Sequence, residues 1–268
     1  MNKGVVDLSF PICNEFASSG GLFLSGNSGF VTLGLDSLAT ISVGGSILIG
    51  NSQVAMLQIP LLSQLAGSLI VNMSALHEIE LPSLSMISGT MGIEKTQIEA
   101  LRFPSLFEVP GSLRVIENSE LVDLSLEILR SISILIVERN SKLARISLNS
   151  MENFISILIF DNPMLKELVI PMLISIGSQF FIVNNPSLNS INLSNWISGN
   201  SKSSLEIAEN QNLQIIDLRY QVCFLKNTFI LRNNPNLRVI YLSVGSNCPN
   251  LIQSTGNPLL EYVYVESS

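Results

Sequence analysis

Charged residues, histidine, cysteine and long apolar runs are all scarce in this 268-residue sequence. Charged residues make up 13% of the chain, and the net charge is −7 without any cluster of Lys or Arg, which argues against a nucleic-acid-binding protein. Every apolar run falls well short of the ~18 residues of a membrane-spanning helix, so we expect no membrane insertion. Helical spacing of apolar residues is never sustained, which leaves strands as the predicted secondary structure.

A strong internal repeat is present instead. Residues 111–176 divide into three 22-residue segments that align without a gap, GSLRVIENSELVDLSLEILRSI, SILIVERNSKLARISLNSMENF and ISILIFDNPMLKELVIPMLISI. A fixed period of this length is typical of a solenoid, whose coils bury apolar residues by stacking on their neighbours. Within a coil, apolar alternation before the Asn predicts a first strand, I-x-L after it a second strand, and the final L-x-x-I a short third strand.

The repeat extends over almost the whole chain. We predict an all-β solenoid of parallel strands with about eleven coils of 22–25 residues, in which residues 20–268 form one domain and the last coil lies at about 249–265. Residues 1–19 do not fit the repeat, and we expect them to cap the first coil because an open β-edge invites aggregation.

An Asn recurs at the turn after the first strand, although the third and fourth coils lack it. Asn tolerates the left-handed conformation of a turn, and stacked Asn side chains can also bond the turns above and below. An ordinary turn residue is the alternative interpretation. The predicted structural Asn ladder comprises Asn27, Asn51, Asn118, Asn140, Asn162, Asn185, Asn210, Asn234 and Asn257.

The motif N-N-P-x-L-x-x-I-x-L, present at 184–193 and begun again at 233–237, resembles the receptor L domain. That domain occurs in ectodomains of insulin-receptor and EGF-receptor type kinases, and a similar repeat occurs in GPI-anchored fungal cell-wall proteins. The resemblance covers about residues 20–265 and implies a right-handed parallel β-helix related to leucine-rich repeats. Receptor members bind polypeptide hormones, whereas fungal relatives serve wall integrity. This chain has few cysteines, no Cys-rich module and no kinase, so no ligand residue is transferred.

Residues for catalysis are hard to find. His77 lies beside Glu78 and Glu80 but has no second His or Cys near it in sequence, so we expect an ordinary surface residue rather than a metal or acid–base site. The outward column of the second strand lacks an acidic cluster; it contains Glu80, Arg102, Ser125, Ser147, Val169, Asn192, Asp217 and Tyr241. We therefore expect no catalytic, cofactor-binding or metal-binding site and predict that the chain is not an enzyme. A β-helix carbohydrate-active enzyme remains a remote alternative, because its fold is neighbouring.

The first strand offers a more informative surface. Leu113 and Val115, like Ile157 and Ile159, are expected to point inward, so the residues between them must point outward. Stacking would gather the outward residues into an apolar strip, and large exposed apolar patches usually mark contact surfaces. Coverage by the cap or a loop, or a register slip of one residue, are the alternatives. The predicted partner-contact strip consists of Ile116, Ile136, Leu158, Phe160, Phe181, Val183 and Ile230.

Two kinds of modification are also expected. Cys223 and Cys248 lie 25 residues apart near the ends of successive coils, and coils stacked ~4.8 Å apart could be joined by a disulfide; two buried thiols are the alternative. Cys13 would then be unpaired. The sequons at Asn72 and Asn192 are candidate glycosylation sites, although chance matches are expected in a chain this rich in Asn and Ser.

Together these patterns predict a non-enzymatic extracellular or cell-surface recognition or adhesion domain that binds a protein or glycan through a sheet face. The alternative is a structural surface or cell-wall protein that associates with itself through the apolar strip. The N-terminal stretch lacks the apolar core of a signal peptide, so we expect either a mature fragment of a secreted protein or a protein that is not secreted.

Overall fold

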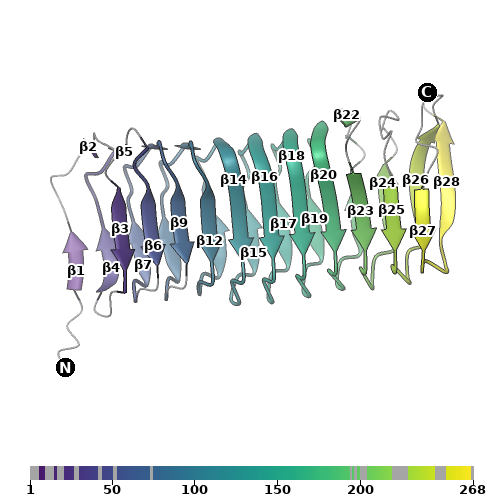
Figure 1. Cartoon of the computed structure of the whole chain (residues 1–268), viewed down its shortest axis with the longest axis horizontal. Coiled ribbons are helices and arrows are strands. Elements are labelled where there is room, and N and C mark those ends of the chain that lie inside the picture. The colour runs from purple at the N-terminus through teal and green to yellow at the C-terminus, as the bar shows by residue number, and fades with distance from the viewer. Residues whose placement is uncertain are drawn as a thin grey trace.

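The computed structural model is a parallel β-solenoid whose strands stack along one long axis, with β1 at one end and β28 at the other (Figure 1). The structure describes residues 6–9, 15–16, 21–26, 30–41, 44–50, 53–72, 75–193, 195, 198–199, 204–218, 229–244 and 252–266. Every pairing between these strands is parallel, and no helix occurs among the described residues. The all-β solenoid predicted from the 22-residue period is confirmed.

The first side of each coil is the strand that precedes the Asn turn. It is formed by β3 (Leu22–Ser25), β6 (Ile47–Gly50), β9 (Leu69–Asn72), β12 (Met91–Glu94), the second halves of β14 (Glu108–Ile116), β16 (Ser131–Glu138), β18 (Asn153–Phe160) and β20 (Ser175–Val183), and then β23 (Ser204–Ala208), β25 (Phe229–Arg232) and β27 (Ile252–Thr255). These strands belong to one continuous sheet.

The second side is divided into three four-stranded sheets. The strands are β1 (Val6–Ser9), β4 (Phe30–Gly34), β7 (Met56–Gln58) and β10 (Glu78–Glu80), then β13 (Ala100–Arg102), β15 (Asp123–Ser125), β17 (Arg145–Ser147) and β19 (Glu167–Val169), then β21 (Ser190–Asn192), β24 (Ile215–Leu218), β26 (Val239–Val244) and β28 (Glu261–Glu266). The short strands reflect the short I-x-L segments that form them.

The third side consists of two-residue strands and the first halves of the long strands β14, β16, β18 and β20. The short strands are β2 (Glu15–Phe16), β5 (Thr40–Ile41), β8 (Gln64–Leu65), β11 (Met86–Ile87) and β22 (Ser198–Gly199). In the middle coils the third strand therefore continues directly into the first strand of the next coil. Register shifts between Val109 and Ser112 and between Phe154 and Ser156 mark that corner.

The solenoid has about nine turns, fewer than the predicted eleven coils, because eleven first strands stack but only nine strands of the third side are present among the described residues. The last three coils contribute only first and second strands among the described residues, namely β23 with β24, β25 with β26, and β27 with β28. Strands β1 and β2 come from residues 1–19 and pair with β4 and β5, so the described part of the predicted cap extends two sides of the solenoid.

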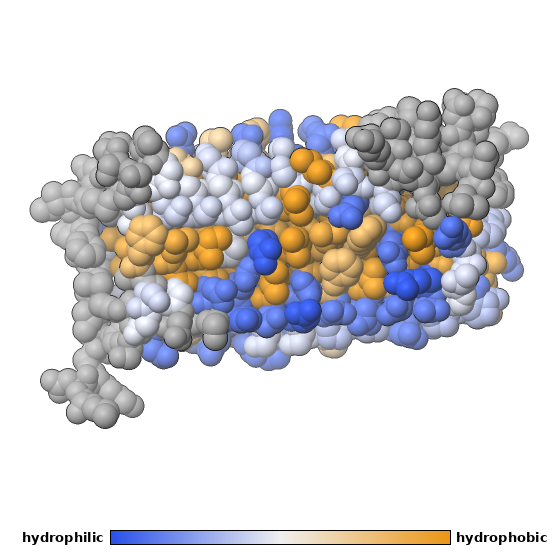
Figure 2. Space-filling view, viewed as in Figure 1, coloured by the Kyte–Doolittle hydropathy of each residue, from blue (hydrophilic) through white to orange (hydrophobic). Residues whose placement is uncertain are grey.

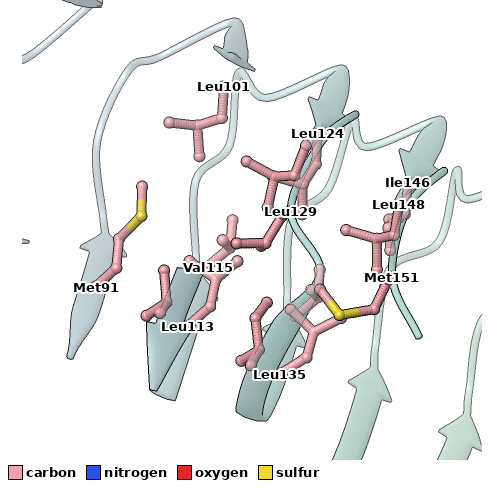
Figure 3. Close-up of a cluster of buried hydrophobic side chains, with 14 of the residues drawn as sticks. Met91, Leu101, Leu113, Val115, Leu124, Leu129, Leu135, Ile146, Leu148 and Met151 are labelled. Carbon is pink, nitrogen blue, oxygen red and sulfur yellow. The ribbon is translucent and has the colours of Figure 1, made fainter. Parts of the chain in front are cut away.

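The core is formed by inward side chains that stack on the same residue of the neighbouring coil. Figure 3 shows Leu113 and Leu135 from first strands, with Leu124 and Ile146 from second strands directed toward the same interior. All four side chains are almost completely buried. Each such side chain contributes roughly 1.5–3 kcal/mol by leaving water, so the stacked rows supply most of the stabilisation of neighbouring coils.

The turn after the first strand is made by the residue before the ladder Asn. Positive φ values belong to Glu117, Arg139 and Asp161 and to their equivalents in other coils, which include Asn184 and Asn233, rather than to the ladder Asn residues that the turn chemistry had suggested. A left-handed non-glycine residue costs roughly 1–2 kcal/mol. Part of this cost is offset because each backbone N–H still bonds to the next coil, for example from Glu117 to the Glu138 carbonyl at 2.9 Å.

Neighbouring positions on the first side should respond differently to truncation. Leu135 is fully buried and Ile136 is partly exposed on the opposite side of the strand. We expect Leu135→Ala to lower the free energy of unfolding by about 2–5 kcal/mol, and Ile136→Ala to lower it by less than about 1.5 kcal/mol. Urea unfolding followed by circular dichroism measures both. Equal losses in the two variants would contradict this register.

Candidate functional site

The first side presents two outward columns, which together we call the first-strand face. Ladder registers stack each outward residue on its equivalent in the next coil. The upstream column is Phe23, Leu48, Ile70, Gly92, Arg114, Ile136, Leu158, Phe181, Glu206, Ile230 and Gln253. The downstream column is Ser25, Gly50, Asn72, Glu94, Ile116, Glu138, Phe160, Val183, Ala208, Arg232 and Thr255.

Six residues of the predicted contact strip lie together in the middle of this face, which we call the central patch. Five of them are partly exposed, and Ile116 is 9% exposed. The intervening residues Leu113, Val115, Ile157 and Ile159 are fully buried, as the alternation requires. The central patch consists of Ile116, Ile136, Leu158, Phe160, Phe181 and Val183.

The seventh predicted strip residue, Ile230, is separated from the central patch. Glu206 pairs with both Phe181 and Ile230 in the ladder and therefore lies between them in the upstream column. Glu138 likewise interrupts the downstream column, and its carboxylate pairs with the Arg139 guanidinium at 2.6 Å. The strip is thus an apolar patch with charged boundaries rather than an unbroken stripe.

Two ion pairs flank the central patch, one on each side. Arg114 Nε lies 2.8 Å from Glu94 Oε1 on its N-terminal side, and Arg232 Nη2 lies 2.8 Å from Glu206 Oε1 on its C-terminal side. Both carboxylate side chains are only 18% exposed, whereas the two Arg side chains are 42% and 47% exposed. Each pair crosses from one column to the other between neighbouring coils, so these residues are far apart in sequence.

A second apolar cluster lies nearer the N-terminus on the same face. Phe23, Leu48 and Ile70 stack in the upstream column, and Phe23 is 62% exposed. Figure 2 shows apolar atoms along this face in separate groups with hydrophilic atoms between them. Sequence reasoning missed this cluster because it followed the outward positions only from the fifth coil onward. The same spacing from the turn would have identified it.

The predicted ladder residues from Asn118 to Asn234 are fully buried in one column. In a typical step, Asn162 Oδ1 accepts hydrogen bonds from the Asn140 backbone N–H at 3.1 Å and from Asn140 Nδ2 at 3.2 Å. Asn162 Nδ2 in turn donates to the Val137 carbonyl of the preceding coil at 3.0 Å. One amide side chain therefore makes three hydrogen bonds to the preceding coil.

The same geometry continues at both ends of the column. Asn257 Oδ1 accepts from the Asn234 backbone N–H at 2.8 Å. In the fourth coil Thr96 replaces Asn, and its hydroxyl and backbone N–H donate to Asn118 Oδ1 at 2.7 and 3.0 Å. Asn27 and Asn51 lie outside the described residues. The Asn column has a structural role, because its side-chain oxygens and nitrogens form hydrogen bonds within the protein.

The second side carries the other residues that the sequence analysis singled out. His77, Glu78 and Glu80 are exposed, and Glu80 accepts a hydrogen bond from Gln58 at 2.6 Å. In the same outward column Ser147 and Asp217 are buried, whereas Arg102 and Asn192 are exposed. A search of the described ranges found no group of three or more His, Cys, Asp or Glu residues placed to hold a metal ion. Within those ranges no helix has the length and apolar character needed to cross a membrane.

One carboxylate on this side has a shifted pKa. Hydrogen bonds lower the pKa of Glu127, first from the Ser125 hydroxyl at 2.7 Å and then from Asn149 Nδ2 and the Ser147 hydroxyl, with a further contribution from the positive charge of Arg145. Partial burial acts in the opposite direction. This cluster joins two neighbouring coils, and its Ser and Asn donors form hydrogen bonds with the Glu127 carboxylate.

The remaining predicted modification sites are only partly described. Cys13, Cys223 and Cys248 lie outside the described residues, so the disulfide stays a prediction. Asn192 is exposed on the second side. Asn72 lies on the first-strand face, where its Nδ2 donates to Glu94 Oε2 at 3.3 Å. Glycosylation at either Asn also stays a prediction.

Comparisons with protein-family models, with curated proteins and with solved structures found no match. The coarse part of the sequence resemblance, a parallel β-solenoid compatible with a leucine-rich-repeat-like β-helix, is supported by the strand stacking itself. Function must therefore be argued from the surface of this chain.

Replacing a central ladder residue should destabilise the stack. In Asn162→Ala the buried Asn140 N–H and Nδ2 groups lose their acceptor, and each unsatisfied group costs about 1–3 kcal/mol. Asn236→Ala is the matched control, because Asn236 is exposed and bonds a single carbonyl. Urea unfolding should show a loss of at least about 2 kcal/mol for the first variant and little change for the second. Similar stability in both would contradict a structural role for the column.

The Glu127 cluster should be visible by titration. Because hydrogen bonds favour the ionised carboxylate, Ser125→Ala should raise the pKa of Glu127 toward its ordinary value. A lowered folded pKa means that Glu127 stabilises the fold above its unfolded pKa and that this contribution is lost as pH falls through the folded pKa. Carboxyl-carbon NMR measures the midpoint, with Ser83→Ala as a distant control. An unchanged Glu127 midpoint in Ser125→Ala would refute this cause.

Proposed function

We propose that this chain is a non-enzymatic recognition domain that binds a protein partner through its first-strand face. The observation that carries the proposal is the central patch, where six large apolar side chains lie together on an outward sheet surface. Contiguous outward apolar residues of this kind usually mark a contact surface on a soluble protein. The receptor-L-like repeat adds an expectation of an extracellular or cell-surface setting.

The chemistry of the patch favours a protein over a glycan. Its side chains are aliphatic or phenyl groups and offer no hydrogen bond to a sugar hydroxyl. A hydroxyl buried without a hydrogen-bonding partner costs roughly 1–3 kcal/mol. The flanking ion pairs Glu94–Arg114 and Glu206–Arg232 supply a polar rim around an apolar centre, which is the usual composition of protein interfaces.

A substitution in the patch tests the proposal. The probe is a phage library of random peptides panned on the wild-type chain immobilised at low density. We expect enriched peptides to bind Phe181→Glu at least about tenfold more weakly, because the new charge would be desolvated on binding. Met164→Glu is the control, since Met164 is 48% exposed and lies outside the first-strand face.

Thermal unfolding of both variants establishes that neither has lost its fold. Peptides that bind Phe181→Glu as tightly as the wild type would contradict a recognition role for this face. Failure to enrich any peptide for the wild-type chain would do the same.

A further inference from the structure

The two ion pairs on the first-strand face are arranged symmetrically about one coil. In the upstream column Arg114 lies two coils before Leu158, and Glu206 lies two coils after it. In the downstream column Glu94 lies three coils before Phe160, and Arg232 lies three coils after it. At equal distances from strand β18, each column therefore carries opposite charges.

This symmetry has a direct geometric consequence for pairing between identical faces. Two copies can pack face to face by rotation about a two-fold axis that lies in the interface. If that axis is parallel to β18, the order of coils is reversed and each column faces itself. The two solenoids then run antiparallel, and position n before β18 meets position n after it in the second copy.

We propose that the partner of the first-strand face is a second copy of this chain, docked antiparallel about an axis through Leu158 and Phe160. This inference rests on the proposed function and names its partner. Arg114 then faces Glu206 of the second copy, and Glu94 faces Arg232 of the second copy. Each end of the interface becomes a group of four charges with alternating sign and no net charge.

The remaining positions of the face are paired by the same arrangement. Ile136 faces Phe181 of the second copy. Ile116, which is 9% exposed, lies opposite Ala208, which is fully buried, so this pair adds little contact area. Gly92 lies opposite Ile230, although the Ile70 side chain reaches over Gly92 to within 3.1 Å of the position that a Cβ would occupy. Glu138 faces Val183, and its carboxylate already has the Arg139 guanidinium at 2.6 Å as a partner. The separation of Ile230 from the central patch is thereby explained, since Ile230 meets a different part of the partner's face.

The other two-fold arrangement fits poorly. An axis along the solenoid would place each coil against itself and exchange the two columns. Arg114 would then face Ile116, and Arg232 would face Ile230, so each charged group would pack against an apolar residue of the second copy and keep only the ion-pair partner within its own chain. Such burial is costly, and this pattern of charges therefore selects the antiparallel arrangement.

The size of the overlap sets the expected affinity. Strands β9 to β27 form nine stacked coils that overlap when the order is reversed about β18. Eight rises of ~4.8 Å and four-residue strands of ~3.3 Å per residue give a face of about 38 by 13 Å, or roughly 500 Å² per copy. A total of about 1,000 Å² lies at the lower limit of specific interfaces, so we expect a dimer that dissociates in the micromolar range.

Paired charge reversals test the arrangement while keeping an ion pair at each end of the face within one chain. Glu94→Arg with Arg114→Glu keeps the ion pair within one chain but places like charges opposite each other in the dimer. Glu206→Arg with Arg232→Glu does the same from the other end. When the two double variants are mixed, both ends of the heterodimer regain opposite charges.

Sedimentation velocity over a concentration series on the full chain measures each species. We expect the wild type to dimerise, each double variant alone to dimerise at least about tenfold more weakly, and their equimolar mixture to recover a dissociation constant within about threefold of wild type. Raised salt should weaken the wild-type dimer. Circular dichroism and thermal unfolding confirm that both variants retain the fold.

The outcomes separate this inference from the proposed function. A wild type that remains monomeric at its highest soluble concentration overturns the proposal that the partner is a second copy. In that case peptide panning with Phe181→Glu still tests whether the first-strand face binds another protein. Double variants that dimerise as well as wild type overturn the antiparallel register. A Phe181→Glu variant that dimerises unchanged shows that dimerisation uses another surface, which overturns this inference without deciding the panning result.

Discussion

The hydrogen bonds of the buried Asn column are the constraint on which the rest of the structure depends. Each step joins an amide oxygen to the backbone of the preceding coil, as between Asn162 and Asn140 at 3.1 Å. Strand hydrogen bonds alone would tolerate sliding, but a slip of one residue would break these contacts and exchange the inward and outward sides of every strand. The column therefore fixes which residues form the core and which form the first-strand face. The apolar rows around Leu113 and Leu135 supply the larger stabilisation, whereas the Asn residues supply the register.

Because the register is fixed, the spacing of residues in the sequence determines which side chains are neighbours on the surface. Residues 22–25 positions apart become neighbours, so a contact surface can be assembled from one residue per coil. The same rule places the ion pairs Glu94–Arg114 and Glu206–Arg232, each between neighbouring coils, around the central patch. A surface built in this way is extended along the solenoid, with one residue of each column contributed by each coil. The proposal that this face recognises another protein rests on that extended apolar pattern.

The sequence predicted the features that depend on period and alternation. The 22-residue spacing of Asn118, Asn140 and Asn162 led to the solenoid and to the buried column, and alternation assigned Leu113 and Val115 to the interior. Features that depend on the conformation of corners were missed. The left-handed residue is Glu117 rather than Asn118, and the third strand merges with the next first strand in β14, neither of which follows from residue preferences. The ion pairs were missed because their members occupy different columns and become neighbours only after the coils are stacked.

Backbone hydrogen exchange at the ladder positions tests the central claim most directly. The N–H groups of Asn118, Asn140, Asn162, Asn185 and Asn210 each donate to a side-chain oxygen of the following coil in a fully buried column. Residue-resolved NMR exchange at low protein concentration should therefore place them among the slowest amides of the chain, opening only with the stack itself. Exchange at these five amides as fast as at exposed turn amides would mean that the column does not hold the coils in register, and the assignment of the first-strand face would lose its basis.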